Sequence, residues 1–94
     1  MRMTQKPETK NSDGLETAFL LVSVPEMIER ALVEELRELP EVVEAYVTLG
    51  GWNVFLKIKV KDRRDIAGFV LAHLKGRAIE TRTLFSLDSK DTPR

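Results

Sequence analysis

The stretch VVEAYVTLGGWNVFLKIKV, residues 42–60, decides the fold. Apolar and polar residues alternate on both sides of Gly50 and Gly51, as they do in two half-buried strands. Glycine adopts positive φ readily, so the glycine pair predicts a tight hairpin turn. The resulting cross-strand pairs are Glu44–Lys57, Tyr46–Phe55, Val47–Val54, Ala45–Leu56 and Val43–Ile58. A shift by one residue would lose these chemically matched pairs, so the register is well defined.

The segment before the hairpin predicts a strand and a helix. Residues 17–24 are apolar and partly β-branched, which is typical of a strand with little solvent on either face. Pro25 suits the first position of a helix. Apolar residues then recur at helical spacing until Pro40 ends the run.

The segment after the hairpin predicts a second helix and a last strand. Asp62 is a good N-cap, with Asp65 three residues later, and Gly76 ends the helix. Residues 79–87 read as the closing strand. The order βαββαβ predicts an α+β, ferredoxin-like fold, in which a four-stranded antiparallel sheet carries both helices on one face.

The length of 94 residues allows one small domain. We expect a flexible N-terminal tail at residues 1–16, a folded domain at 17–88 and a C-terminal tail at 89–94, because both ends are polar and lack an apolar period. No run of 18 apolar residues exists, so we expect no membrane partner and a cytoplasmic location.

The composition excludes several kinds of chemistry. Lys and Arg (15) balance Asp and Glu (15), which removes the bulk electrostatic argument for nucleic acid. Without cysteine there is no disulfide or thiolate metal site, and with His73 as the one histidine we expect no metal and no cofactor. We expect His73 to be a buried, neutral residue with one hydrogen bond. Asn and Gln number only three, which indicates a thermophile source.

The sheet face without helices carries an apolar patch. Alternation places Phe19, Leu21, Tyr46, Phe55 and Leu84 there. If these side chains stay exposed to water, the domain loses on the order of 10 kcal/mol of burial free energy, which is large for so small a domain. These five residues therefore predict a dimer interface, with two sheets packed face to face.

Three short motifs carry a family resemblance. They are Pro40-Glu41-Val42 before the hairpin, Gly50-Gly51-Trp52-Asn53 at its turn, and Thr81-Arg82-Thr83 in the last strand. In this order and spacing, the chain resembles the effector-binding (RAM) domain of the Lrp/AsnC, or feast-famine, transcriptional regulators. The resemblance covers nearly the whole folded part.

The resemblance implies an amino-acid sensor. Members of the family form dimers through their sheets, assemble further into octamers or similar rings, and bind amino acids between dimers near the glycine turn. Ligand-binding residues would be Gly50, Gly51, Trp52, Asn53, Thr81 and Thr83. The chain departs from the family in two ways: Asn53 replaces an acid, and a 16-residue tail cannot hold the helix-turn-helix that reads DNA. The chain is thus similar to stand-alone members, which would bind no DNA directly and would act through full-length regulators.

Each candidate residue also has a structural interpretation. A hairpin turn needs Gly50 and Gly51 regardless of a ligand, and Trp52 is as well suited to packing. Asn53 is common beside turns, and the two threonines of the last strand are favoured in any strand. Residues 26–44 hold seven Glu and two Arg, and residues 57–82 hold eight Lys or Arg and three acids, which we interpret as solvated faces.

Two other functions compete with sensing. RNA-recognition modules share the βαββαβ order and place aromatic residues where Phe19 and Phe55 lie. The sequence from Gly50 to Ile58 matches their signature poorly, however. Acylphosphatases also share the topology, but the acidic loop Val24-Pro25-Glu26-Met27 would repel phosphate. We expect no enzymatic activity.

Overall fold

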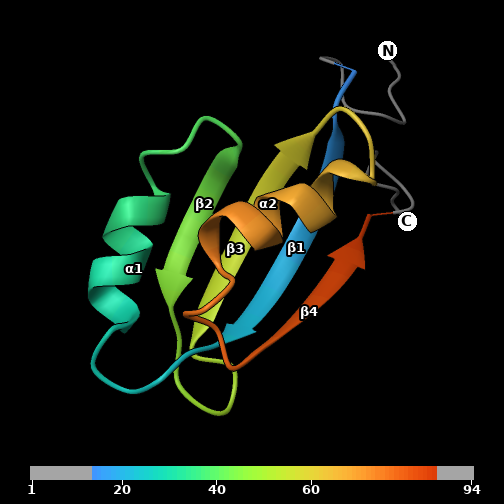
Figure 1. Cartoon of the computed structure of the whole chain (residues 1–94). Helices are drawn as coiled ribbons and strands as arrows, with labels where there is room; N and C mark the ends of the chain where they lie inside the picture. Colours follow the sequence, from blue (N-terminus) through green and yellow to red (C-terminus); the bar gives the residue numbers. More distant parts are fainter. Residues whose placement is uncertain (1–13, 87–94) are drawn as a thin grey trace, which may run out of the picture.

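The computed structural model describes residues 14–86 and contains one four-stranded sheet and two helices (Figure 1). In chain order the elements are β1 (Glu16–Ser23), α1 (Glu29–Leu36), β2 (Val42–Val47), β3 (Val54–Val60), α2 (Asp65–His73) and β4 (Glu80–Phe85). The strand order is β2-β3-β1-β4, and all neighbouring strands are antiparallel. The predicted ferredoxin-like βαββαβ fold is confirmed. Most of the expected N-terminal tail and all of the expected C-terminal tail lie outside the described residues.

A single hydrophobic core lies between the sheet and the two helices. Alternate residues of β1 and β3 are buried and form one cluster with residues of α1 and α2. Their fully buried side chains include Leu20, Val22, Leu56 and Ile58, against which Leu36 of α1 packs. Because every second residue of a strand points to the same side, the intervening residues of β1 and β3 lie on the face without helices.

The hairpin register is confirmed for four of the five predicted pairs, from Glu44–Lys57 to Val47–Val54. The fifth is wrong, because Val42 rather than Val43 pairs with Ile58 and the register shifts between them. Val42 packs against the core, whereas the side chain of Val43 is 46% exposed. A bulge of this kind lets two residues three positions apart, here Val42 and Ala45, both face the core.

The turn is wider than predicted. Strand β2 ends at Val47 and β3 begins at Val54. The loop between them is closed by Thr48, whose N–H donates to the carbonyl of Asn53 at 3.0 Å. The Thr48 hydroxyl donates to the carbonyl of Trp52 at 2.6 Å. Trp52 lies outside the strand, which begins at Val54. Within this turn, only Gly50 has positive φ, at 108°. The predicted two-residue turn is therefore wrong.

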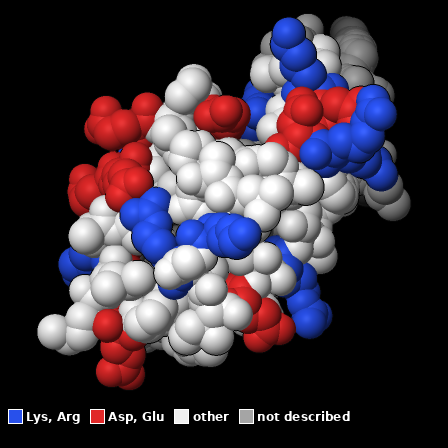
Figure 2. Space-filling model, in the orientation of Figure 1, with Lys and Arg blue, Asp and Glu red and all other residues white. Residues whose placement is uncertain are grey.

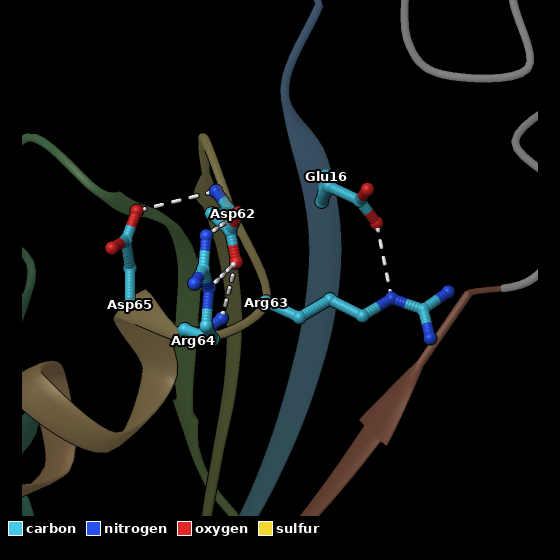
Figure 3. Close-up of polar contacts among 5 residues, drawn as sticks. All are labelled: Glu16, Asp62, Arg63, Arg64 and Asp65. Atoms are coloured by element: carbon cyan, nitrogen blue, oxygen red, sulfur yellow. Dashed lines mark hydrogen bonds and ion pairs between the residues drawn. The ribbon is translucent and has the colours of Figure 1, made fainter.

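The helix starts differ in how well the sequence predicts them. Pro25 does not begin α1, which starts at Glu29 after a loop in which Met27 adopts φ 84°. The predicted N-cap Asp62 lies in the turn before α2, whose N-cap position is Arg64 and has no side-chain cap hydrogen bond. In that turn Asp62 Oδ1 accepts the N–H of Arg64 at 2.8 Å, and the N–H of Asp62 donates to Asp65 Oδ2 at 3.2 Å (Figure 3). At the other end, Gly76 has φ 86° and ends the turn after α2.

Arg64 also forms an ion pair with Asp62. Its Nε and Nη2 atoms each donate to a different oxygen of Asp62 at 3.0 Å (Figure 3). Hydrogen bonds from the Arg64 side chain and backbone lower the pKa of Asp62 to about 2. Arg63 beside it extends the other way, to Glu16 of β1 at 3.3 Å and over the ring of Phe85. These contacts attach the start of α2 to the sheet.

His73 is not the buried histidine that we predicted. Its side chain is half-buried at the end of α2, with its ring 4.9 Å from that of Phe69. Within residues 14–86 its imidazole makes no hydrogen bond, so the expected one is also wrong. The last turn of α2 instead directs the His73 carbonyl to Arg77, whose Nη2 donates to it at 2.7 Å.

Candidate functional site

The sheet face without helices carries the five apolar residues that we predicted as an interface. Register places Phe19 of β1 beside Lys57 and Leu84, and Leu21 beside Phe55 and Arg82. The ring of Phe55 stacks on two others, those of Phe19 at 5.9 Å and Tyr46 at 6.3 Å. Tyr46 and Leu84, at the two edges, are 46% and 51% exposed. This open sheet face (Phe19, Leu21, Tyr46, Phe55 and Leu84) is a continuous apolar surface on one chain.

Three loops meet at one end of the sheet, which we call the turn end. They are the β1–α1 loop, the β2–β3 turn and the α2–β4 loop (Figure 1, bottom). The backbone of Ser23 at the end of β1 accepts a hydrogen bond from the N–H of Ile79, which brings the third loop to the first. Each loop exposes a large apolar side chain: Met27 is 90% exposed, Leu49 99% and Ile79 69%.

Asn53 holds the turn against the β1–α1 loop. Its Oδ1 accepts the N–H of Val24 and its Nδ2 donates to the carbonyl of the same residue, both at 2.9 Å. The second hydrogen of Nδ2 points to Glu29 Oε2, 3.2 Å away. The amide thus bonds both the N–H and the carbonyl of Val24, as the backbone of a neighbouring strand would, and both amide hydrogens are in use.

Glu29 joins the same network from the first turn of α1. Its Oε1 accepts the N–H of Met27 at 2.8 Å, the residue with positive φ. Hydrogen bonds from its own backbone N–H, from Met27 and from the Asn53 amide lower the pKa of Glu29. A carboxylate that is ionised at neutral pH therefore lies beside the turn. The sequence gives no signal for this contact, because the two residues are 24 positions apart.

The backbone of the turn is open. Leu49, Gly50 and Gly51 are all exposed, and among the described residues no acceptor is bonded to their N–H groups. A Cβ built on either glycine would meet nothing within 4 Å. Successive free N–H groups with no side chain above them form the kind of surface that binds a carboxylate or another anion.

Trp52 lies against β4 on the side of the open sheet face. Its indole ring is half-buried, and the guanidinium of Arg82 is 5.6 Å from the ring centroid. Thr81 and Thr83 pair with Val22 and Leu20, whose side chains are in the core, so the two threonines point to the opposite, helix-bearing face. Within one chain the predicted ligand-binding residues thus divide between the turn and the other side of β4.

Two clefts lie elsewhere on the chain. A cleft of about 600 Å³ lies along α2, between Gly68, Phe69 and Ala72 of the helix and the chain at Pro40 and Val60. A smaller one, about 280 Å³, follows the edge strand β2 from Val42 to Tyr46. Neither cleft is lined by residues of the turn.

Charge is distributed unevenly over the helix-bearing face. Acidic side chains gather over α1, with basic ones beside them toward α2 (Figure 2). Arg77 connects the two regions: its Nη1 and Nη2 atoms donate to the two oxygens of Glu35 at 2.8 and 2.9 Å. This bidentate contact lowers the pKa of Glu35. Among residues 14–86, no group of three or more acidic or histidine side chains is placed to hold a metal ion, and no helix could cross a membrane.

Comparison with known sequences connects the chain to a family of regulators. The family model described as the Lrp/AsnC ligand binding domain matches residues 17–94. One similar protein, an uncharacterized HTH-type transcriptional regulator of Pyrococcus abyssi, is 28% identical over 93 residues, which are 94% of this chain and 62% of the relative. A second from the same organism is 32% identical over 74 residues, covering 74% of this chain and 47% of the relative. The chain thus spans between about half and two thirds of these relatives.

Comparison with solved structures gives the same fold. A protein of Thermus thermophilus superposes with a TM-score of 0.71 at 27% identity, covering 84% of this chain and 99% of that one. A hypothetical protein of Pyrococcus horikoshii gives 0.67 at 29% identity, covering 76% and 88%. AsnC of E. coli, at 20% identity and 0.70, covers 84% of this chain and 55% of its own, and shows the shared fold alone.

Proposed function

The chain belongs to the Lrp/AsnC ligand-binding domain family, and from this membership we propose that it is an oligomeric sensor of amino acids or closely related small molecules. The resemblance drawn from the three sequence motifs is confirmed. The family is a binding domain of transcriptional regulators and not an enzyme family, so the chain has a regulatory, effector-binding role. The Pyrococcus origin of the relatives agrees with the thermophile source that the composition indicates.

The exposed turn is the observation that carries the ligand-binding part of the proposal. Its N–H groups at Leu49, Gly50 and Gly51 have no acceptor among the described residues, and space lies above the glycines. An amino acid would place its carboxylate on these N–H groups and its side chain against Trp52. Thr81 and Thr83 would contribute from a neighbouring copy, because within one chain they face away from the ring of Trp52.

The open sheet face supports a dimer. Three stacked aromatic rings and two leucines form a continuous apolar surface on a domain with a small core. Packing this face on that of a second copy buries both, about a two-fold axis. We propose the open sheet face as the dimer interface.

The turn end supports a second contact, between dimers. Met27, Leu49 and Ile79 are three large apolar side chains that stand almost free in solvent around the proposed ligand site. A cluster of this kind is typical of a protein interface. Contacts there would assemble dimers into an octamer or a similar ring and would enclose the ligand, since neither of the two clefts described above is lined by the turn.

The proposal extends to partners. The curated relatives are regulators of the HTH type, of which this chain matches only a part. We propose that it acts in the cytoplasm, binds no DNA itself and assembles with full-length Lrp/AsnC regulators. An RNA-recognition role would need the aromatic face to be free. A dimer covers that face, so the two functions exclude each other.

Light scattering and thermal melting with each of the twenty amino acids test the proposal. We expect a mass that is a multiple of 10.7 kDa and a higher melting temperature with one ligand or ligand class. A ligand at 100 times its Kd adds about 2.7 kcal/mol, which for a domain of this size is roughly 10 °C or more. A monomer that responds to no amino acid, but binds single-stranded RNA with steep salt dependence, would replace sensing by RNA binding.

A further inference from the structure

A carboxylate lies at the turn although the motif there has none. The motif Gly50-Gly51-Trp52-Asn53 ends in an amide, whose two Nδ2 hydrogens are used by Val24 and Glu29 and whose Oδ1 accepts the N–H of Val24. Asn53 therefore has no hydrogen left for a ligand, and an amide carries no charge to attract an ammonium group. Glu29 Oε2 lies 3.2 Å from Asn53 Nδ2, so an acid from α1 lies beside the amide that ends the motif.

The Glu29 carboxylate is held from two sides. Met27 N–H donates to Oε1 at 2.8 Å, and Asn53 Nδ2 donates to Oε2. Together with the N–H of Glu29 itself, these contacts occupy three of the roughly four acceptor positions of a carboxylate. Glu29 can thus accept one further donor without giving up the contacts that orient it.

The carboxylate is also close to the free N–H groups of the turn. Gly51 and Asn53 are two residues apart, so their Cα atoms are separated by no more than about 7 Å. The carboxylate that bonds the Asn53 side chain and the N–H groups of Gly50 and Gly51 thus belong to the same end of the sheet. The Met27 backbone, at φ 84°, is in a conformation that residues other than glycine rarely adopt. In this conformation its N–H donates to Glu29 Oε1.

We propose that Glu29 is the residue that binds the α-ammonium group of the ligand and so makes the site selective for amino acids over plain carboxylic acids. The inference rests on the proposed function, because it assigns a role within that site. The turn N–H groups bind the carboxylate that both ligand classes share. Glu29 then adds a charge-assisted contact that only an amine can use.

Paired ligands test this role. L-phenylalanine is compared with 3-phenylpropionate, and L-leucine with 4-methylpentanoate, by calorimetric titration of the full chain. Each pair differs only in the amino group. For wild type we expect a preference for the amino acid of about ten- to a hundredfold, the value of a charge-assisted hydrogen bond. In Glu29→Gln we expect the preference to fall close to one, with little change for the carboxylic acid.

Glu26→Gln is the matched control, because Glu26 is an exposed acid in the same loop. It removes the same charge, and the preference should persist. The double variant E29Q/N53D exchanges the amide and the acid, and should regain the preference even if E29Q alone is poorly folded. In this variant the carboxylate introduced at position 53 still accepts the N–H of Val24, and the amide introduced at position 29 can donate to that carboxylate. The carbonyl of Val24 loses its donor, so urea denaturation first checks that the variant is folded.

The outcomes distinguish failure of the role of Glu29 from failure of the proposed ligand site. If E29Q keeps the preference for the amino acid, the role of Glu29 is overturned and the proposed site stands. The same follows if the double variant folds but shows no preference. Wild type that binds neither member of either pair would overturn the proposed site, and the role of Glu29 with it. Loss of the preference in E29Q, its retention in E26Q and its return in the double variant would establish the role.

Discussion

Asn53 connects segments that the sequence places far apart. Its amide bonds both backbone groups of Val24, 29 residues earlier, and one oxygen of Glu29. The sequence predicted a polar residue beside a turn and a role in ligand binding. The structure adds a role that no local pattern could indicate, since it depends on which loops meet at the turn end.

Replacing Asn53 by alanine tests the structural part of this role. The N–H and carbonyl of Val24 would lose their partners in a part-buried position, so we expect a loss of about 1–3 kcal/mol in the free energy of unfolding. Urea denaturation measures it. Glu26→Ala in the β1–α1 loop is the control, because Glu26 is exposed and its replacement should change stability by less than about 0.5 kcal/mol. Equal effects of the two substitutions would contradict the role of Asn53.

Asp62 gives the stability of the domain a pH dependence. Arg64 lowers the pKa of Asp62 from 3.8 to about 2, so the folded state holds the proton less tightly than the unfolded state. The stabilisation is therefore present above about pH 4 and is lost as the pH falls from about 4 toward 2. In Asp62→Asn, which can still accept the N–H of Arg64, we expect a lower melting temperature at about pH 7 and a smaller decrease between about pH 4 and pH 2.

Thermal melting at a series of pH values measures this difference. Glu38→Gln, on the exposed side of the chain just after α1, is the control for removing one acid. A constant difference between wild type and D62N down to about pH 2 would show that the ion pair with Arg64 does not stabilise the fold.

At the scale of elements, the edge strand β2 is where sequence and structure differ most. Its register was predictable from Glu44 onward, because charges and aromatic rings form matched pairs there. It was not predictable at Val42 and Val43, which are chemically identical and give pattern analysis no preference. The bulge follows from packing, since Val42 fits the core beside Leu39.

The two valines offer a matched pair of substitutions. Val42→Ala removes two methyl groups from a side chain packed on the core, so we expect a loss of about 1–2 kcal/mol in the free energy of unfolding. Val43→Ala alters an exposed residue, and we expect a change below about 0.5 kcal/mol. Chemical denaturation at one protein concentration compares them. The reverse order would restore the register predicted from the sequence.

The protection of β2 is a further element-level feature. The guanidinium of Arg37 donates through Nε and Nη2 to the carbonyl of Ala45, at 3.2 and 2.8 Å. Together with the bulge, this covers a strand edge that would otherwise pair with another chain. Neither device is visible in the sequence, because it depends on where α1 packs beside β2.

At the scale of the whole molecule, the difference between the two faces of the sheet predicts a dimer through the open sheet face and not through the helix-bearing face. Leu84→Asp places a charge on the open sheet face at a residue that is 51% exposed, so folding should be preserved while the proposed dimer is lost. Light scattering should show the mass fall to that of one chain.

Leu71→Asp is the control for the open sheet face. Leu71 is 61% exposed on α2, on the helix-bearing side, and a charge there should leave the mass unchanged. Dissociation by both variants, or by L71D alone, would move the interface away from the open sheet face.

The position of Trp52 has a practical consequence for spectroscopy. It is the single tryptophan of the chain, it is half-buried beside the turn, and a guanidinium stands over its ring. Intrinsic emission excited at the red edge of the absorption band therefore originates from one place in the protein. Any shift in its wavelength or quenching reports on the turn itself, so occupancy of the proposed site can be followed optically without attaching a dye.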